Sequence, residues 1–247
     1  MTSDATHIQS ARAETDTGPE RLRNLVTGAR VVFWGFDGPL CRLFSGDAAE
    51  RVAAGLLRWL EGRGLHGLPG EPGWEAPDPW AVLRAVHRRQ PGGALTDELE
   101  ERLTQEELRA VPSAMPTAWA DPLIRTWTAV GARPAVVTGR SPRAVRAYLA
   151  ERGLLACFEP HIYGRTRDAR RSEPDPHRLH HALRATGADP STAVLIGDTP
   201  SAFAAAREAG VGFLGYARAE PRAQALRRAG APVVVRSLEP VLRLLRE

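Results

Sequence analysis

Three polar side chains directly follow apolar runs of the sequence, and their types suit chemistry at phosphorus or at a metal ion. Asp37 ends the stretch VVFWGFD, Thr138 ends RPAVVT, and Asp198 follows TAVLIG. Aspartates can transfer protons or bind Mg²⁺, and a threonine hydroxyl before a helix can hold an anion. Two aspartates two residues apart would make a strong phosphoryl-transfer motif, but Gly35 stands where the partner of Asp37 would be.

The elements that must position these residues alternate between strands and helices. Val31–Phe36, Arg133–Thr138 and Thr192–Gly197 have the composition of strands buried on both faces, and HIYG, VGFLGY and PVVV are shorter candidates. Helical patterns such as SPRAVRAYLAERG, DPHRLHHALRATG and SAFAAAREAG separate them. This alternation predicts an α/β fold with a mostly parallel sheet and helices on both faces. Because function in such sheets collects at the carboxyl ends of the strands, the three polar residues should converge at one edge.

The block after the first strand is helical instead. Apolar residues recur at spacings of three and four in DAAERVAAGLLRWLEGRG, DPWAVLRAVHRR and LTDELEERLTQEELRAV, and no convincing strand interrupts them. We predict that residues 43–115 form an all-helical insertion and that residues 26–42 and 116–247 form the α/β core. Residues 1–25 are predicted to be a polar tail with room for one short helix at its end.

Four motifs in this order resemble the haloacid dehalogenase-like superfamily, in particular its phosphoglycolate-phosphatase-like members with a helical cap. The resemblance runs from about Arg30 to the C-terminus. The motifs are GFDG, TGR, SEPDP and GDTPSA. This resemblance implies a Rossmann-like core and a cap that closes over the substrate.

The resemblance also implies roles for single residues. In that family one aspartate attacks phosphorus, and a second, two residues later, acts as acid and base. Asp37 matches the second aspartate. Thr138, followed by Gly139 and Arg140, matches the hydroxyl that binds phosphoryl oxygens. Asp198 matches the first of the acids that hold Mg²⁺.

Three positions depart from the family pattern. Gly35 replaces the nucleophile, Glu173 stands where the family has a lysine, and Ala202 replaces a further acid of the metal loop. All 33 basic residues are arginines, so no lysine can move into the site. Arg140 or Arg171 could bring a guanidinium close, but a guanidinium cannot supply the missing nucleophile. Asp198 is the remaining carboxylate of the metal loop, and it supplies few of the oxygen ligands that Mg²⁺ needs.

We therefore expect a family member without phosphatase activity that serves as a binding or regulatory module. Its ligand would be a phosphorylated small molecule or a protein partner at the cap cleft, and its cofactor either none or weakly bound Mg²⁺. The alternative is an active phosphomonoester hydrolase with a rearranged site. The losses at Gly35, Glu173 and Ala202 favour the first reading, because one loss can be compensated more easily than three.

Each of these candidate site residues also has a simpler, structural explanation. Asp37 could only cap a turn, Thr138 could be structural, and Asp198 could only be a favourable acid at a helix start. Cys41 could face the site, yet no nearby residue is arranged to activate its thiol. The spacing of three histidines on one segment could hold a metal, although a polar helix face explains it better; they are His177, His180 and His181.

Composition and charge argue against several other classes of protein. The net charge is +4, but the arginines alternate with acids along amphipathic segments, which disfavours a nucleic-acid surface. Only Cys41 and Cys157 occur, which argues against a disulfide scaffold or a cysteine metal site. No apolar run is long enough to cross a membrane, and Met1–Thr17 is too polar for a signal peptide. A cytoplasmic location is the expectation.

Overall fold

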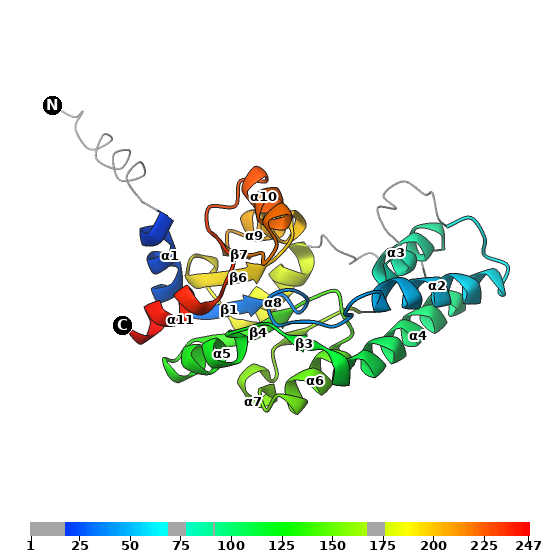
Figure 1. Cartoon of the computed structure of the whole chain (residues 1–247), viewed down its shortest axis with the longest axis horizontal. Coiled ribbons are helices and arrows are strands. Elements are labelled where there is room, and N and C mark those ends of the chain that lie inside the picture. Colours follow the sequence, from blue (N-terminus) through cyan, green and yellow to red (C-terminus); the bar gives the residue numbers. More distant parts are fainter. Residues whose placement is uncertain (1–17, 69–77, 91, 167–175) are drawn as a thin grey trace.

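The computed structural model describes residues 18–68, 78–90, 92–166 and 176–247. At its centre is a parallel sheet of six strands in the order β5-β4-β1-β6-β7-β8 (Figure 1). These strands are β1 (Val31–Trp34), β4 (Arg133–Val137), β5 (Ile162–Tyr163), β6 (Ala193–Gly197), β7 (Gly212–Tyr216) and β8 (Val234–Val235).

Helices cover both faces of the sheet. Val32 and Trp34 of β1 pack into one apolar cluster, while Val31 and Phe33 pack into another, because side chains alternate across a strand. The first cluster lies under α1 (Gly18–Thr27), α5 (Ala120–Ala129), α6 (Pro142–Glu151), α7 (Leu155–Phe158) and α11 (Glu239–Arg246). The second lies under α8 (Pro176–Thr186), α9 (Pro200–Glu208) and α10 (Glu220–Arg228). The predicted fold class is confirmed.

The last part of the predicted polar tail is a helix that belongs to the core. Leu22, Leu25 and Val26 lie on one side of α1, and this side packs into the first cluster. The helix lies beside α11 in Figure 1, and Arg23 forms an ion pair of 2.6 Å with Glu247. The helices at the two ends of the described chain therefore cover the same face of the sheet.

The segment after β1 forms a lobe of three helices beside the sheet (Figure 1). They are α2 (Ala48–Glu61), α3 (Pro79–Arg89) and α4 (Ala94–Ala110). Their apolar faces form a separate cluster that includes Leu60, Val86 and Leu103. The start of α3 is set by Asp78, whose carboxylate accepts hydrogen bonds from the backbone of Trp80 and Ala81. We call α2–α4 the helical insertion.

Two short strands join the insertion to the core. β2 (Cys41–Arg42) pairs antiparallel with β3 (Met115–Pro116), where the chain enters and leaves the insertion. The sequence pattern predicted no strand in this block, because two residues are too few to show a period. Short 3₁₀ turns, η1 (Val111–Ser113) and η3 (Pro190–Thr192), precede β3 and β6.

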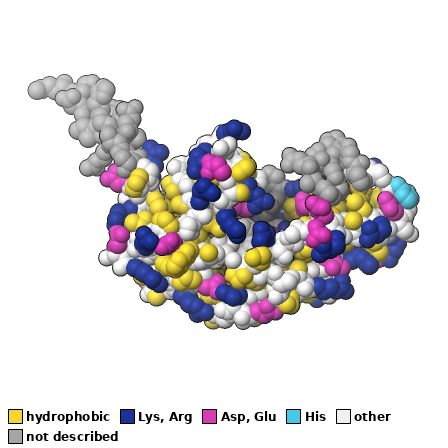
Figure 2. Space-filling view, viewed as in Figure 1, with side chains coloured by type: hydrophobic (Ala, Val, Ile, Leu, Met, Phe, Trp, Pro, Cys, Tyr) yellow, Lys and Arg dark blue, Asp and Glu magenta, His cyan; other side chains and the backbone are white. Residues whose placement is uncertain are grey.

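The charged side chains are spread over the molecule. Figure 2 shows arginines over the whole of the face in view, with acidic side chains among them rather than a single basic stripe. Within the described ranges, no helix has both the length and the apolar character needed to span a bilayer.

Candidate functional site

The three polar residues predicted to converge lie at one edge of the sheet. β1 lies between β4 and β6 and runs parallel to both, so the loops after all three strands leave from the same edge. Asp37 follows β1, Thr138 follows β4, and Asp198 follows β6.

Asp37 is held by two partners from different parts of the chain. Its Oδ1 accepts a hydrogen bond of 3.2 Å from the backbone N–H of Leu43, and its Oδ2 accepts one from Nε of Arg140. The backbone turn beneath it is closed by Gly38, whose N–H donates to the carbonyl of Cys41 at 2.7 Å. The carboxylate that was predicted to act as acid and base is therefore engaged in an ion pair.

Thr138, Gly139 and Arg140 form the tight loop that leads into α6. The buried hydroxyl of Thr138 accepts a 3.2 Å hydrogen bond from the backbone N–H of Arg140. Ser141 then caps α6 by accepting from the N–H of Arg143. Burial by itself lowers the pKa of the Arg140 guanidinium, but the nearby carboxylates of Asp37 and Glu107 raise it above its ordinary value. Arg140 is thus a permanent cation at this edge.

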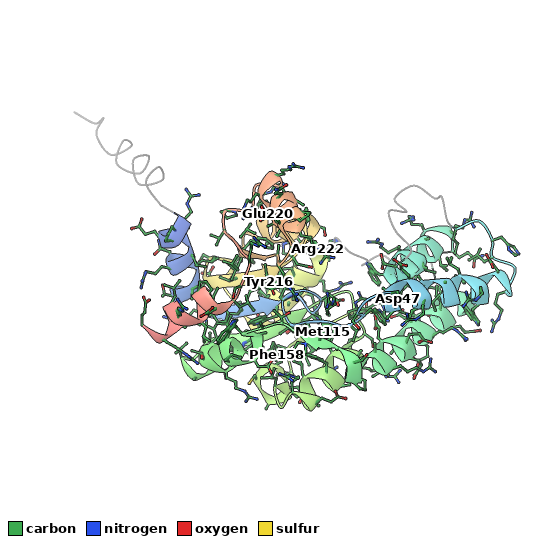
Figure 3. The ribbon with its side chains drawn as sticks, in the orientation of Figure 1. Asp47, Met115, Phe158, Tyr216, Glu220 and Arg222 are labelled. Atoms are coloured by element: carbon green, nitrogen blue, oxygen red, sulfur yellow. The ribbon has the colours of Figure 1, made fainter. Side chains whose placement is uncertain are left out.

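Asp198 lies against the turn after β1. A Cβ placed on Gly38 would come within 2.6 Å of Oδ2 of Asp198, and Gly38 has φ +85, so no other residue fits there without strain. Arg222 of α10 reaches the same oxygen at 3.4 Å. Burial raises the pKa of the Tyr216 phenol, and the charge of Asp198 adds to that rise. Figure 3 labels Tyr216 and Arg222 on the core side of the molecule.

The two positions at which the resemblance predicts acids, Gly35 and Ala202, border a small pocket. Gly35, Asp198 and Ala202 line a hollow of about 70 Å³ together with apolar residues of β4 and β6 and with Arg178 and Leu179 of α8. A Cβ on Gly35 would meet the carbonyl oxygen of Ile196 at 3.2 Å and the ring of Pro39 at 3.4 Å. A side chain at position 35 therefore fits only after a shift of a few tenths of an ångström.

The other predicted positions are not part of this arrangement. Glu173 and Arg171 lie outside the described residues. His181 of α8 packs edge-on against the ring of Tyr163 at 5.5 Å, which suits a helix face better than a metal ligand. His177 and His180 lie on the same helix.

Cys41 is excluded as a replacement nucleophile. Its side chain is fully buried, and burial raises the pKa of the thiol, with a further rise from the charge of Asp37. Only the thiolate is an effective nucleophile, so a buried thiol that stays protonated is inert. Cys41 instead packs in the first apolar cluster.

The residues that are present do not fit a family-type Mg²⁺ site. Across the described ranges, no three His, Cys, Asp or Glu side chains lie close enough together to hold a metal ion. Asp37 is paired with Arg140, and Arg222 lies beside Asp198. A carboxylate that already lies beside a guanidinium group binds a further cation less well.

Two further charged residues lie at this edge of the sheet, and the sequence did not predict them. Glu107 of α4 is fully buried and accepts hydrogen bonds from Arg165, which follows β5, and from the backbone N–H of Ser141. Arg165 is only 2% exposed and also donates to Thr104 and Glu100 of α4. The sequence did carry one sign of this contact. Residues 100, 104 and 107 lie on one face of a helix, so they can contact the same partner.

The comparisons with known proteins agree on the fold. The model of a family described as haloacid dehalogenase-like hydrolase matches residues 29–210. No curated protein matches the sequence. A haloacid dehalogenase-like family hydrolase from Streptococcus pneumoniae is 16% identical with TM-score 0.62, covering 88% of this chain and 98% of that one. A predicted phosphatase from Clostridium acetobutylicum is 15% identical with TM-score 0.62, covering 87% and 97%. A predicted phosphoglycolate phosphatase from Haemophilus somnus is 14% identical with TM-score 0.59, covering 88% and 98%. At these identities the structural likeness shows the fold alone.

Proposed function

The chain belongs to the haloacid dehalogenase-like hydrolase family, and we propose that it keeps the family fold without the family's phosphatase reaction. The family match bears out the resemblance seen in the four sequence motifs. The observation that carries the proposal is Gly35, which stands at the nucleophile position and offers no side chain to attack phosphorus.

The surroundings of Asp37 support this reading. An acid/base must reach the leaving group and the attacking water, yet the Asp37 carboxylate is bound on one oxygen by Arg140 and on the other by the Leu43 N–H. Arg140 is in turn within 3.6 Å of the buried Glu107. The retained aspartate serves as a structural partner of an arginine.

The role that remains is binding or regulation. We propose that the cleft between the core and the insertion, which corresponds to the family's cap at residues 43–115, takes a phosphorylated small molecule or a protein partner. The arginines at the sheet edge, Arg140 and Arg222, suit an anionic group. We propose a cytoplasmic setting, in keeping with the two unbridged cysteines.

An active hydrolase with a rearranged site is the second candidate. It is favoured by the retention of Asp37, Thr138 and Asp198 at one edge of the sheet. It requires a nucleophile, and the strongest substitute from the sequence, Cys41, is buried and protonated.

Phosphate release separates the two candidates. We expect the purified protein to release no more phosphate from a panel of sugar and nucleotide monophosphates than its Asp37→Ala variant does. The assay is colorimetric detection of inorganic phosphate at several protein concentrations with millimolar Mg²⁺. Turnover by the natural protein that disappears in Asp37→Ala would establish the hydrolase instead.

Binding of Mg²⁺ is a separate prediction. We expect weak or absent binding at millimolar Mg²⁺, because Ala202 has replaced one acid and Arg222 lies beside Asp198. Isothermal titration calorimetry on the natural protein and on Asp198→Ala measures this directly. Tight binding that is lost in Asp198→Ala would contradict the prediction.

A further inference from the structure

Glu107 is a carboxylate with no exposed surface that points from the insertion into the core. Its Oε1 accepts a 2.9 Å hydrogen bond from Nη1 of Arg165. Its Oε2 accepts one of 3.3 Å from Nη2 of Arg165 and one of 2.9 Å from the N–H of Ser141. The pair with Arg165 is therefore bidentate, the geometry in which a guanidinium binds carboxylates and phosphates best.

The groups that surround this carboxylate belong to the core. Arg140 and Ser141 follow β4, and Arg165 follows β5. The Ser141 N–H opens α6, where backbone N–H groups and the helix dipole favour an anion. We call Arg140, Arg165 and the Ser141 N–H the oxyanion receptor. Its positive groups are anchored from the core side by Asp37, which holds Arg140, and by the carbonyl of Gly139, which holds Arg165.

The receptor offers more donors than Glu107 uses. Nη1 of Arg140 is buried and has no hydrogen-bond acceptor within the described structure, and it lies 3.6 Å from Oε1 of Glu107. A buried donor without an acceptor is costly. A free anion, which is not tied to a helix, could settle closer to Arg140 and accept this hydrogen bond as well.

We propose that the oxyanion receptor is a binding site for a small carboxylate or phosphate group and that Glu107 occupies it as a built-in ligand. The receptor does not include Gly35, but it adjoins the same edge of the sheet, because Arg140 also holds Asp37. An anion that enters the receptor displaces Glu107 and so weakens the attachment of α4 to the core, which Glu100, Thr104 and Glu101 still hold. Ligand binding and attachment of the insertion therefore compete.

The test is rescue of Glu107→Ala by free anions. This variant removes the carboxylate and leaves a gap of the size of formate or acetate. We expect its melting temperature to lie about 6–20 °C below that of the natural protein. Formate, acetate or inorganic phosphate should then raise it by about 4 °C for each tenfold increase above the dissociation constant. The series is run at constant ionic strength against chloride.

Three controls keep the result specific. Glu101→Ala removes another contact between α4 and α6, the exposed pair with Arg143, and should show little destabilisation and no anion-specific gain. Glu107→Gln fills the gap with an amide and should not be rescued. Arg165→Met added to Glu107→Ala should abolish the rescue.

The outcomes decide the proposal. If Glu107→Ala is unfolded in chloride, refolding on addition of acetate or phosphate, followed by circular dichroism, is the equivalent positive result. Rescue by carboxylates alone assigns the site to carboxylate ligands, and rescue by phosphate as well assigns it to oxyanions in general. Stabilisation no greater than with chloride, or equal rescue when Arg165 is absent, overturns the proposal.

Discussion

Gly35→Asp alone is expected to leave the protein without phosphatase activity, whereas Gly35→Asp combined with Glu173→Lys and Ala202→Asp is expected to create it. We expect phosphate release by the triple variant at least about 100-fold above that of the natural protein. The single change supplies a nucleophile but leaves Glu173 where the family has a lysine and adds no second metal acid. With an acid in place of that lysine, the new carboxylate would repel the substrate dianion. Groups that act as one catalytic unit are strongly non-additive, so the gain should appear only in the combination.

The structure supplies the control for this experiment. Because a Cβ at position 35 meets the Ile196 carbonyl at 3.2 Å, any side chain there shifts the loop slightly. Gly35→Ala carries the same steric change without a carboxylate, and the triple built on Gly35→Ala should stay inactive. The measurement is phosphate release from the same monophosphate panel with Mg²⁺. Activity in Gly35→Asp alone, or in the alanine-based triple, would show that the missing groups are not those named.

Arg165→Met is expected to lower the free energy of unfolding by about 3–5 kcal/mol. The guanidinium donates to Glu107, Glu100 and Thr104 of the insertion and to the Gly139 carbonyl of the core. Its removal leaves the carboxylate of Glu107 buried with only the Ser141 N–H and a distant Arg140 as partners. Breaking one side of a buried pair costs far more than the pair contributes as a whole.

Urea unfolding followed by circular dichroism measures this effect. Arg143→Met is the matched control, because Arg143 also joins the core to α4 but is 55% exposed, and its loss should cost less than about 1 kcal/mol. The double variant Glu107→Met, Arg165→Met removes both charges. We expect it to lose less than the sum of the two single variants. A loss below about 1 kcal/mol in Arg165→Met would show that the buried network does not hold the insertion.

The parts of the fold that could be predicted from the sequence are those coded locally. β1, β4 and β6 are apolar runs, and α2, α3 and α4 show the spacing of an apolar helix face. The order of these elements along the chain was enough to indicate a parallel sheet with an insertion after its first strand. That residue 35 is a glycine and that the chain has no lysine also needs no structure, because a residue type that is missing cannot be supplied by folding.

Only the tertiary structure decided what the retained charges do. The sequence indicated that Asp37 lies at a strand end but not that Arg140, 103 residues away, holds its carboxylate. The pairing of Glu107 with Arg165 joins residues 58 positions apart, on a helix and on a loop. Both residues look like ordinary surface charges in the sequence. Whether a charge can be buried depends on the partners that surround it in space, and those partners meet only when the insertion has docked on the core.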